Sequence, residues 1–163
     1  MAIVTPGVIP ASILVTHAQP SWLLQWAQFA ADTRYHQLPE PVVARARLVI
    51  LDCIGAVLAG HAEPEMVRAR QRVSAGNYGA AFLDGTAGTM LEIDEGNQYA
   101  RGHPAIHVVP ALLAAARHKS ISGQQFILAT VLGYEIGARI GIASKLRVTM
   151  HPHGTWGVVG AAL

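Results

Sequence analysis

Charged residues are scarce in this 163-residue chain, at 13% of the sequence where roughly 25% is usual. Lysine and arginine number 12 against 10 acidic residues, and no basic run occurs, so we expect no nucleic-acid partner. Hydrophobic residues reach 52% and the mean hydropathy is +0.33, which is high for a soluble monomer of this size. We therefore expect much of the surface to be buried against partners or against protein that these residues do not include.

Cysteine is nearly absent, because Cys53 is the single one and no internal disulfide can form. It lies in the apolar run "LVILDCIGAVLAG", which predicts a small buried core residue. A nucleophilic cysteine is the alternative, and it would need a nearby base that the sequence does not place. This cysteine usage fits a reducing compartment, so we expect a cytoplasmic protein.

Long uninterrupted apolar runs are also missing, since none reaches the roughly 18 to 20 residues of a membrane span. We expect no membrane partner. Residues 1–20 are apolar but lack a basic start and are interrupted by Pro6, Pro10 and Pro20. They are predicted to form an extended N-terminal arm rather than a signal peptide.

From residue 21 onward, apolar residues recur at helical intervals rather than in alternation, which predicts an all-α helical bundle over 21–163. A capping box, Ser122 to Gln125, predicts the start of one helix. The segment "AAFLDGTAGTMLEIDE" predicts another helix, ending at Gly96. The chain finishes in "GTWGVVGAAL", apolar and without a capping residue, so we expect a domain truncated inside its last element.

The few charges gather in one segment, "LEIDEGNQYARGHP" at residues 91–104. Glu92 and Glu95 are three residues apart and, on a helix end, would be neighbours that raise each other's pKa. His103 would stand at the mouth of the following helix, where an anion is favoured, and Arg101 could clamp a carboxylate. The pattern indicates acid–base chemistry beside a bound carboxylate, with solvated surface acids as the alternative.

Two further histidine patterns are possible sites. "HPAIH" places His103 and His107 on one helix face, as a metal site requires, but zinc proteases have glutamate where Pro104 stands. We therefore predict no metal. "MHPHGTWG" brings His151 and His153 into one glycine-bounded loop before a helix, which favours anion contact or proton transfer over an incidental surface turn.

Four blocks in order, "LPEPVVARARLVILDCIGAVLAG", "DGTAGTMLEIDEGNQYARGHPAIHVVPALLAAAR", "SGQQFILATVLGYEIGARIG" and "HPHGTWGVVGAA", resemble the MmgE/PrpD family. The resemblance runs from about residue 20 to the end. It implies the N-terminal part of a helical domain, with the family's α/β lid domain absent from these residues, and a homodimer as the usual assembly. It also implies a lyase or isomerase that needs no metal or organic cofactor, and a small di- or tricarboxylate as substrate, as for 2-methylcitrate dehydratase.

The resemblance also assigns roles to particular residues. The family's acidic run falls on Glu92, Asp94 and Glu95, its histidine before proline on His103, and its later loop histidine on His151. We expect catalysis by His103, His151 and Asp94. We expect substrate binding by Glu92, Asn97, Arg101 and His153.

Two other functions stay open at this point. One is a catalytically inactive helical module that self-associates as a binding or scaffold protein. The other is a split enzyme, in which a second chain supplies the lid domain.

Overall fold

A computed structural model describes residues 20–74 and 76–163, so most of the predicted N-terminal arm, residues 1–20, lies outside the described residues. The chain separates into two compact units, Met1–Asp32 and Thr33–Leu163. In the described part of the first unit, α1 (Ser21–Asp32) carries an edge-to-face pair of Trp22 and Trp26, whose ring centroids are 5.2 Å apart.

The second unit is built from helices, as the apolar periodicity predicts. In chain order they are η2 (Tyr35–Gln37), α2 (Glu40–His61), α3 (Pro64–Arg70), α4 (Asn77–Thr89), α5 (Pro104–Ala116), α6 (Gly123–Ala143), η3 (Pro152–Gly154) and α7 (Gly157–Ala162). The described residues contain no β-strand, and Asn97 and Gly102 form an isolated bridge. The all-α prediction is therefore confirmed.

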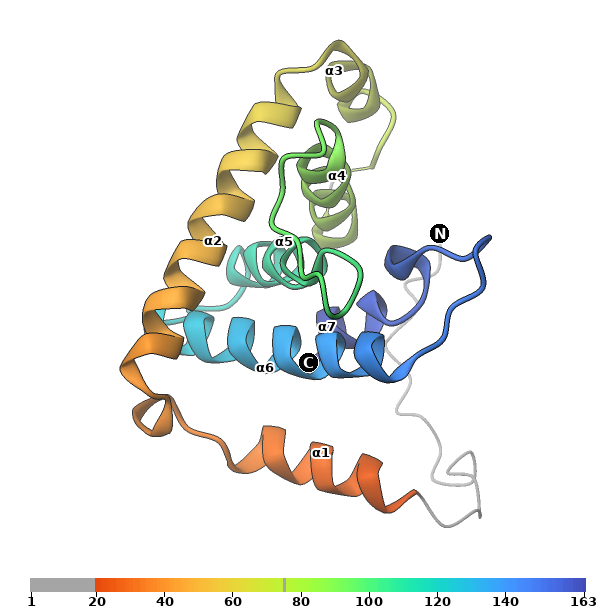
Figure 1. Cartoon of the computed structure of the whole chain (residues 1–163). Helices are drawn as coiled ribbons and strands as arrows, with labels where there is room; N and C mark the ends of the chain where they lie inside the picture. The colour runs from red at the N-terminus through yellow and green to blue at the C-terminus, as the bar shows by residue number, and fades with distance from the viewer. Residues whose placement is uncertain (1–19, 75) are drawn as a thin grey trace, which may run out of the picture. The chain divides into compact units, whose positions relative to one another are not determined.

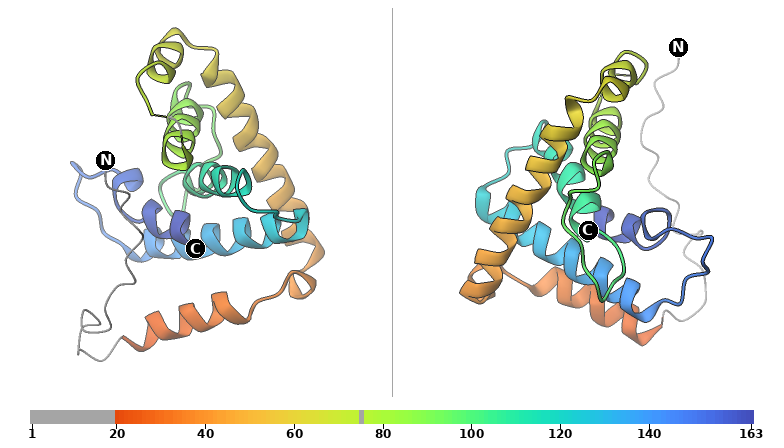
Figure 2. Two further views of the ribbon diagram at one scale, coloured as in Figure 1. Left: turned by 180° about the vertical axis from the view of Figure 1, so that it is seen from behind. Right: turned by 45° about the horizontal axis from the view of Figure 1, so that its top comes forward.

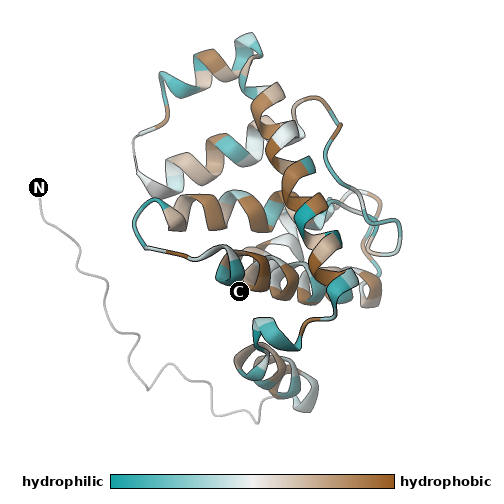
Figure 3. Cartoon of the chain, turned by 90° about the vertical axis from the view of Figure 1, so that its left-hand side faces the viewer, coloured by the Kyte–Doolittle hydropathy of each residue, from teal (hydrophilic) through white to brown (hydrophobic). Residues whose placement is uncertain are grey.

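α5 lies at the centre of this unit, packed against α2, α4, α6 and α7 (Figure 1; Figure 2). The main core forms where α2 meets α5, from Cys53, Val57, Ala105, Ile106 and Val109. Cys53 is fully buried and its pKa is raised to about 12, chiefly by burial, so the prediction of a core residue is confirmed. In Figure 3 hydrophobic and hydrophilic residues both occur along the helices.

α6 begins with the predicted capping box. The Ser122 hydroxyl accepts a hydrogen bond from the Gln125 backbone amide, and the Gln125 side-chain oxygen accepts one from the Ser122 backbone amide. By length and composition this helix could cross a membrane, although it contains Glu135 and Arg139 and is not an uninterrupted apolar run. Core helices of soluble proteins pass the same test. Here α6 packs against α2, α5 and α7 and buries Leu132 and Ile136 among others.

The prediction that a helix runs to Gly96 is wrong, because α4 ends at Thr89. Glu92 has a left-handed backbone with φ of 53°, which a continuing helix does not permit. Three acids in the last turn would also oppose the helix dipole. Residues 90–103 instead form a connection that we call the acidic loop, and Glu92 and Glu95 are not neighbours on a helix.

Candidate active site

The acidic loop delivers His103 to the N-terminus of α5, where it is the N-cap residue. Gly102 makes this approach possible, since a Cβ there would lie 2.8 Å from both Pro152 and the Trp156 ring. Any larger residue would push the acidic loop away from the segment that carries His151 and His153. The glycine thus brings together two histidine motifs that are almost fifty residues apart in sequence.

Four imidazoles and one carboxylate meet at this junction, and we call Asp94, His103, His107, His151 and His153 the histidine cluster. His151 and His153 stack with ring centroids 4.4 Å apart, and His103 stacks on His153 at 5.6 Å. On the inner side, His153 Nδ1 lies 3.0 Å from His107 Nε2, a hydrogen bond whose direction depends on the tautomers.

Asp94 contacts the cluster from the acidic loop. Its Oδ2 atom lies 3.1 Å from His103 Nδ1, and its side chain is only 3% exposed. The two atoms lie within ion-pair distance without an aligned hydrogen bond. Burial raises the pKa of Asp94, and the His103 imidazole opposes that shift. The Asp94 carboxylate can orient the His103 ring through this electrostatic contact.

The inner imidazoles are held neutral at physiological pH. The pKa of His107 is lowered to about 4, first by burial and then by the neighbouring imidazoles His153, His103 and His151. The pKa of His153 is also lowered, by burial and then by His151 and His103. These two imidazoles therefore offer hydrogen-bond acceptors beside His103 and the exposed His151.

A cavity of about 670 Å³ adjoins the cluster, with His107 and His153 in its wall. The rest of its lining is largely apolar and comes from α4, α5 and α7: Ala81, Phe82, Gly85, Thr86, Thr89, Ile106, Pro110, Ala111, Gly157, Val158 and Ala161. It is large enough for a small organic acid.

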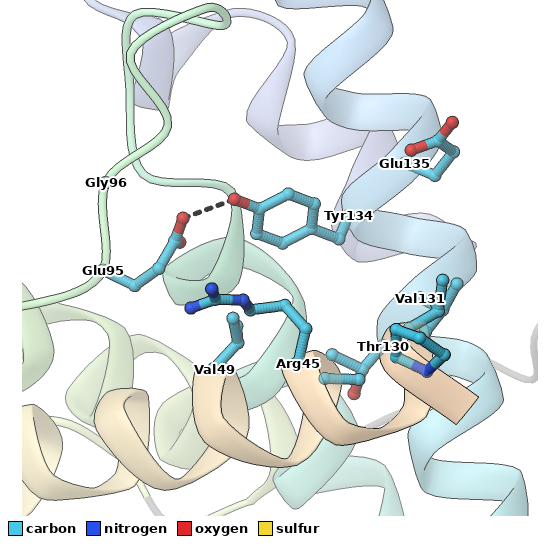
Figure 4. A pocket seen from close by; sticks show the side chains of 11 residues that line it. Arg45, Val49, Glu95, Gly96, Thr130, Val131, Tyr134 and Glu135 are labelled. Carbon is cyan, nitrogen blue, oxygen red and sulfur yellow. Dashed lines mark hydrogen bonds between the residues drawn. The ribbon is translucent and has the colours of Figure 1, made fainter. Parts of the chain in front are cut away.

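Glu95, next to Asp94 in the acidic loop, finds its hydrogen-bond partners on α5 and α6. Tyr134 of α6 donates a hydrogen bond to Glu95 Oε1 (Figure 4). The Ala105 amide donates to Glu95 Oε2 at 3.2 Å. Burial raises the pKa of Glu95, and these two donors oppose the shift. The pair borders a second cavity of about 520 Å³, into which Arg45 of α2 extends toward Glu95 and Tyr134 (Figure 4).

The structure brings the predicted catalytic residues His103, His151 and Asp94 into one cluster with His153. Glu92 is exposed, but its charge acts on both Asp94 and His153. Arg101 is exposed with a left-handed backbone, φ 55°.

Asn97 lies apart from the imidazole contacts. Its side-chain oxygen accepts hydrogen bonds from the Tyr99 and Ala100 amides, and its amide donates to Tyr134. These bonds fix the acidic loop, and none of them involves the histidine cluster.

Sequence reasoning missed His107 as a proton-transfer neighbour and Tyr134 as a partner of the acidic loop. The HPAIH spacing marks His107 only as a metal ligand, whereas the structure packs it against His153. In the part of the chain that the structure describes, no group of three or more His, Cys, Asp or Glu side chains is arranged to hold a metal ion. Nothing in the sequence around Tyr134 indicates that its partner is Glu95, 39 residues away.

The second unit is thus an all-α domain with a carboxylate–imidazole cluster beside a cavity, and comparison with known proteins shows its family. The MmgE/PrpD N-terminal domain matches residues 24–79 and 75–163. This chain therefore belongs to the MmgE/PrpD family.

Curated relatives are similar at moderate identity. The chain is 30% identical over 138 residues to the cis-aconitate decarboxylase-like protein oryM of Aspergillus oryzae, covering 71% of this chain and 29% of that protein. It is 30% identical over 141 residues to cis-aconitate decarboxylase of Aspergillus terreus, covering 71% of this chain and 28% of that enzyme. The chain thus spans less than a third of the length of these relatives. No solved structure matches it.

Proposed function

We propose that this chain is the N-terminal helical portion of a lyase or isomerase that acts on small di- or tricarboxylates by acid–base chemistry, without a cofactor. The observation that carries the proposal is the buried Asp94 carboxylate 3.1 Å from His103 Nδ1, at the edge of the imidazole cluster. Family membership and the lyase names of the relatives support the same reaction class.

In this proposal His103 exchanges a proton with the carbon next to a substrate carboxylate, while Asp94 fixes the orientation of its ring. His151, at the exposed end of the stack, serves as the second proton carrier. A positioned acid or base of this kind contributes roughly 10²- to 10⁴-fold in rate. His153, held neutral between them, offers a hydrogen bond to the substrate.

The carboxylate of the substrate needs cationic or N–H partners. At the N-terminus of α5, Pro104 has no N–H and the Ala105 amide already donates to Glu95. The proposed anchor is therefore Arg101, with Glu92 selecting among the substrate's other polar groups. The Asn97 side chain, predicted to bind substrate, is engaged within the acidic loop instead. This arrangement relies less on the helix dipole than the sequence pattern predicts.

The first substrate to test is cis-aconitate, because both named relatives are cis-aconitate decarboxylases or similar to them. Dehydration of 2-methylcitrate is the second reaction to test. A cytoplasmic homodimer, or a complex with a second chain that supplies the lid domain, is the assembly that we propose for turnover.

The decisive experiment follows each substrate by ¹H NMR with the purified chain, alone and with a lid-bearing partner chain. His103→Ala should lower kcat/KM by about 10²- to 10⁴-fold with an unchanged circular dichroism spectrum. His118→Ala is the matched control, since His118 is exposed and beyond the last residue of α5. Full activity in His103→Ala would eliminate the proposed role of the histidine cluster.

A non-catalytic, self-associating module is the second candidate, favoured by one surface. Leu48, Leu51 and Leu58 of α2 are 57%, 67% and 67% exposed, at helical spacing, with Gly55 open between them. An exposed apolar stripe on a helix otherwise built into the core is typical of an interaction surface. Sedimentation showing stable assembly, together with no turnover of any carboxylate in the presence of a lid-bearing chain, would favour this candidate.

A further inference from the structure

The N-terminus of α5 is capped from outside the helix. Its N-cap residue, His103, makes no side-chain capping bond, so its imidazole is free for the histidine cluster. Glu95 supplies the missing acceptor, since its Oε2 atom takes the hydrogen bond from the Ala105 amide at 3.2 Å. A carboxylate at this end of a helix is also favoured by the helix dipole.

Tyr134 forms hydrogen bonds with two residues of the acidic loop, Glu95 and Asn97. It donates to Glu95 Oε1, and its oxygen accepts a hydrogen bond from the Asn97 amide at 3.3 Å. Asn97 is in turn paired with Gly102 through the backbone, at 2.8 Å from Asn97 N to Gly102 O. A single phenol on α6 therefore connects Glu95 to the residue that immediately precedes His103.

Asp94 and Glu95 are consecutive but have different partners. Asp94 contacts the His103 ring, while Glu95 contacts Ala105 and Tyr134, so the backbone between them is held from two sides. A shift of Glu95 would move Asp94 and the His103 backbone together. The histidine cluster thus depends on a network that lies outside it.

We propose that Glu95 and Tyr134 are positioning residues of the histidine cluster, which hold the acidic loop so that Asp94 faces His103. The inference rests on the proposed function for its catalytic consequence, and on the hydrogen-bond network alone for its structural one. No hydrogen bond joins Glu95 or Tyr134 to an imidazole, and the charge of His103 reaches Glu95 through space. In this proposal the two residues position His103 through the loop between them.

The test compares Glu95→Ala, Glu95→Gln and Tyr134→Phe in the full 163-residue chain. Glutamine keeps a carbonyl oxygen that can accept from the Ala105 amide, but its NH₂ group cannot accept a hydrogen bond from Tyr134. Glu95→Gln should therefore disturb the position of His103 less than Glu95→Ala does. Glu135→Gln is the control, because Glu135 adjoins Tyr134 on α6 but pairs with Arg139. Its loss removes a nearby carboxylate without touching the network.

The first readout is the ¹⁵N spectrum of the backbone and imidazoles, which requires no turnover. Glu95→Ala and Tyr134→Phe should move the Ala105 amide signal and the His103 ring signals, Glu95→Gln should move them less, and Glu135→Gln should leave them unchanged. His103 ring signals that stay fixed in folded Glu95→Ala and Tyr134→Phe would overturn the proposal and leave Glu95 as a helix cap only.

The second readout is the split between kcat and KM in the active assembly. Misplacement of a catalytic group by about 1 Å can cost 10²-fold, so kcat of Glu95→Ala should fall by about that factor with KM within about 2-fold. An unchanged kcat per folded molecule would overturn the positioning role. If the wild-type assembly turns over no carboxylate, the proposed function fails, while the ¹⁵N spectra still decide whether Glu95 and Tyr134 position His103.

Discussion

The crossing of α2 and α4 gives a stability prediction in which two glycines of one helix respond in opposite directions. Gly60 faces α4 so closely that a Cβ would lie 1.8 Å from the carbonyl oxygen of Ala87. Gly55, five residues earlier on α2, faces open space, with nothing within 4 Å of a Cβ. The same substitution, glycine to alanine, therefore tests packing at one position and helix propensity at the other.

For Gly60→Ala we expect a large loss of stability. The obstacle is backbone rather than a movable side chain, so α4 must retreat by about 1.2 Å to restore a 3.0 Å contact. Overpacking costs about 1 to 3 kcal/mol, and a backbone clash belongs at the upper end, about 3 kcal/mol. For a chain of this length that corresponds to a fall in Tm of about 6 to 12 °C.

For Gly55→Ala we expect a gain, because alanine is favoured over glycine in an exposed helix by about 1 kcal/mol. The Tm should rise by about 2 to 4 °C. Thermal unfolding followed by circular dichroism at 222 nm measures both variants. A Gly60→Ala protein as stable as Gly55→Ala would refute the close crossing of α2 and α4.

Three other predictions test separate parts of the molecule. Asp84→Ala removes a largely buried carboxylate that lies 2.8 Å from His61 Nε2 and 3.5 Å from Arg117, so urea unfolding should show a loss of about 1 to 3 kcal/mol. The His107 pKa of about 4 in the folded chain lies below the ordinary value of 6.5. The unfolded chain therefore binds this proton more tightly, and His107 makes the protein less stable as the pH falls from 6.5 toward 4. In His107→Gln the urea midpoint should depend less on pH over that range than it does in the wild type. An equally steep pH dependence would contradict the assignment. Cys53, fully buried with its pKa raised to about 12, should react with Ellman's reagent only at the rate of unfolding, and rapid labelling of the native chain would show that it is accessible.

The helices and the grouping of charged residues and histidines could be predicted because their signals are local. The Ser122–Gln125 capping box lies within one turn, and the apolar positions of α2 and α6 repeat at the helical period. The acidic loop was recognisable because its acids, arginine and histidine are consecutive in a chain poor in charge. The end of the preceding helix could not be predicted, because α4 stops at Thr89 and nothing in the local sequence marks the left-handed backbone at Glu92.

Sequence alone therefore determined an all-α chain with one charged loop and two histidine motifs, since each is a pattern of neighbouring residues. Only the tertiary structure decided which groups meet. His107 and His153 are 46 residues apart and Glu95 and Tyr134 are 39 apart, and no local preference encodes either pair. They meet because Gly102 lets the acidic loop approach Trp156 and because α5 and α6 pack side by side, and both depend on the shapes of surfaces that exist only once the helices have packed.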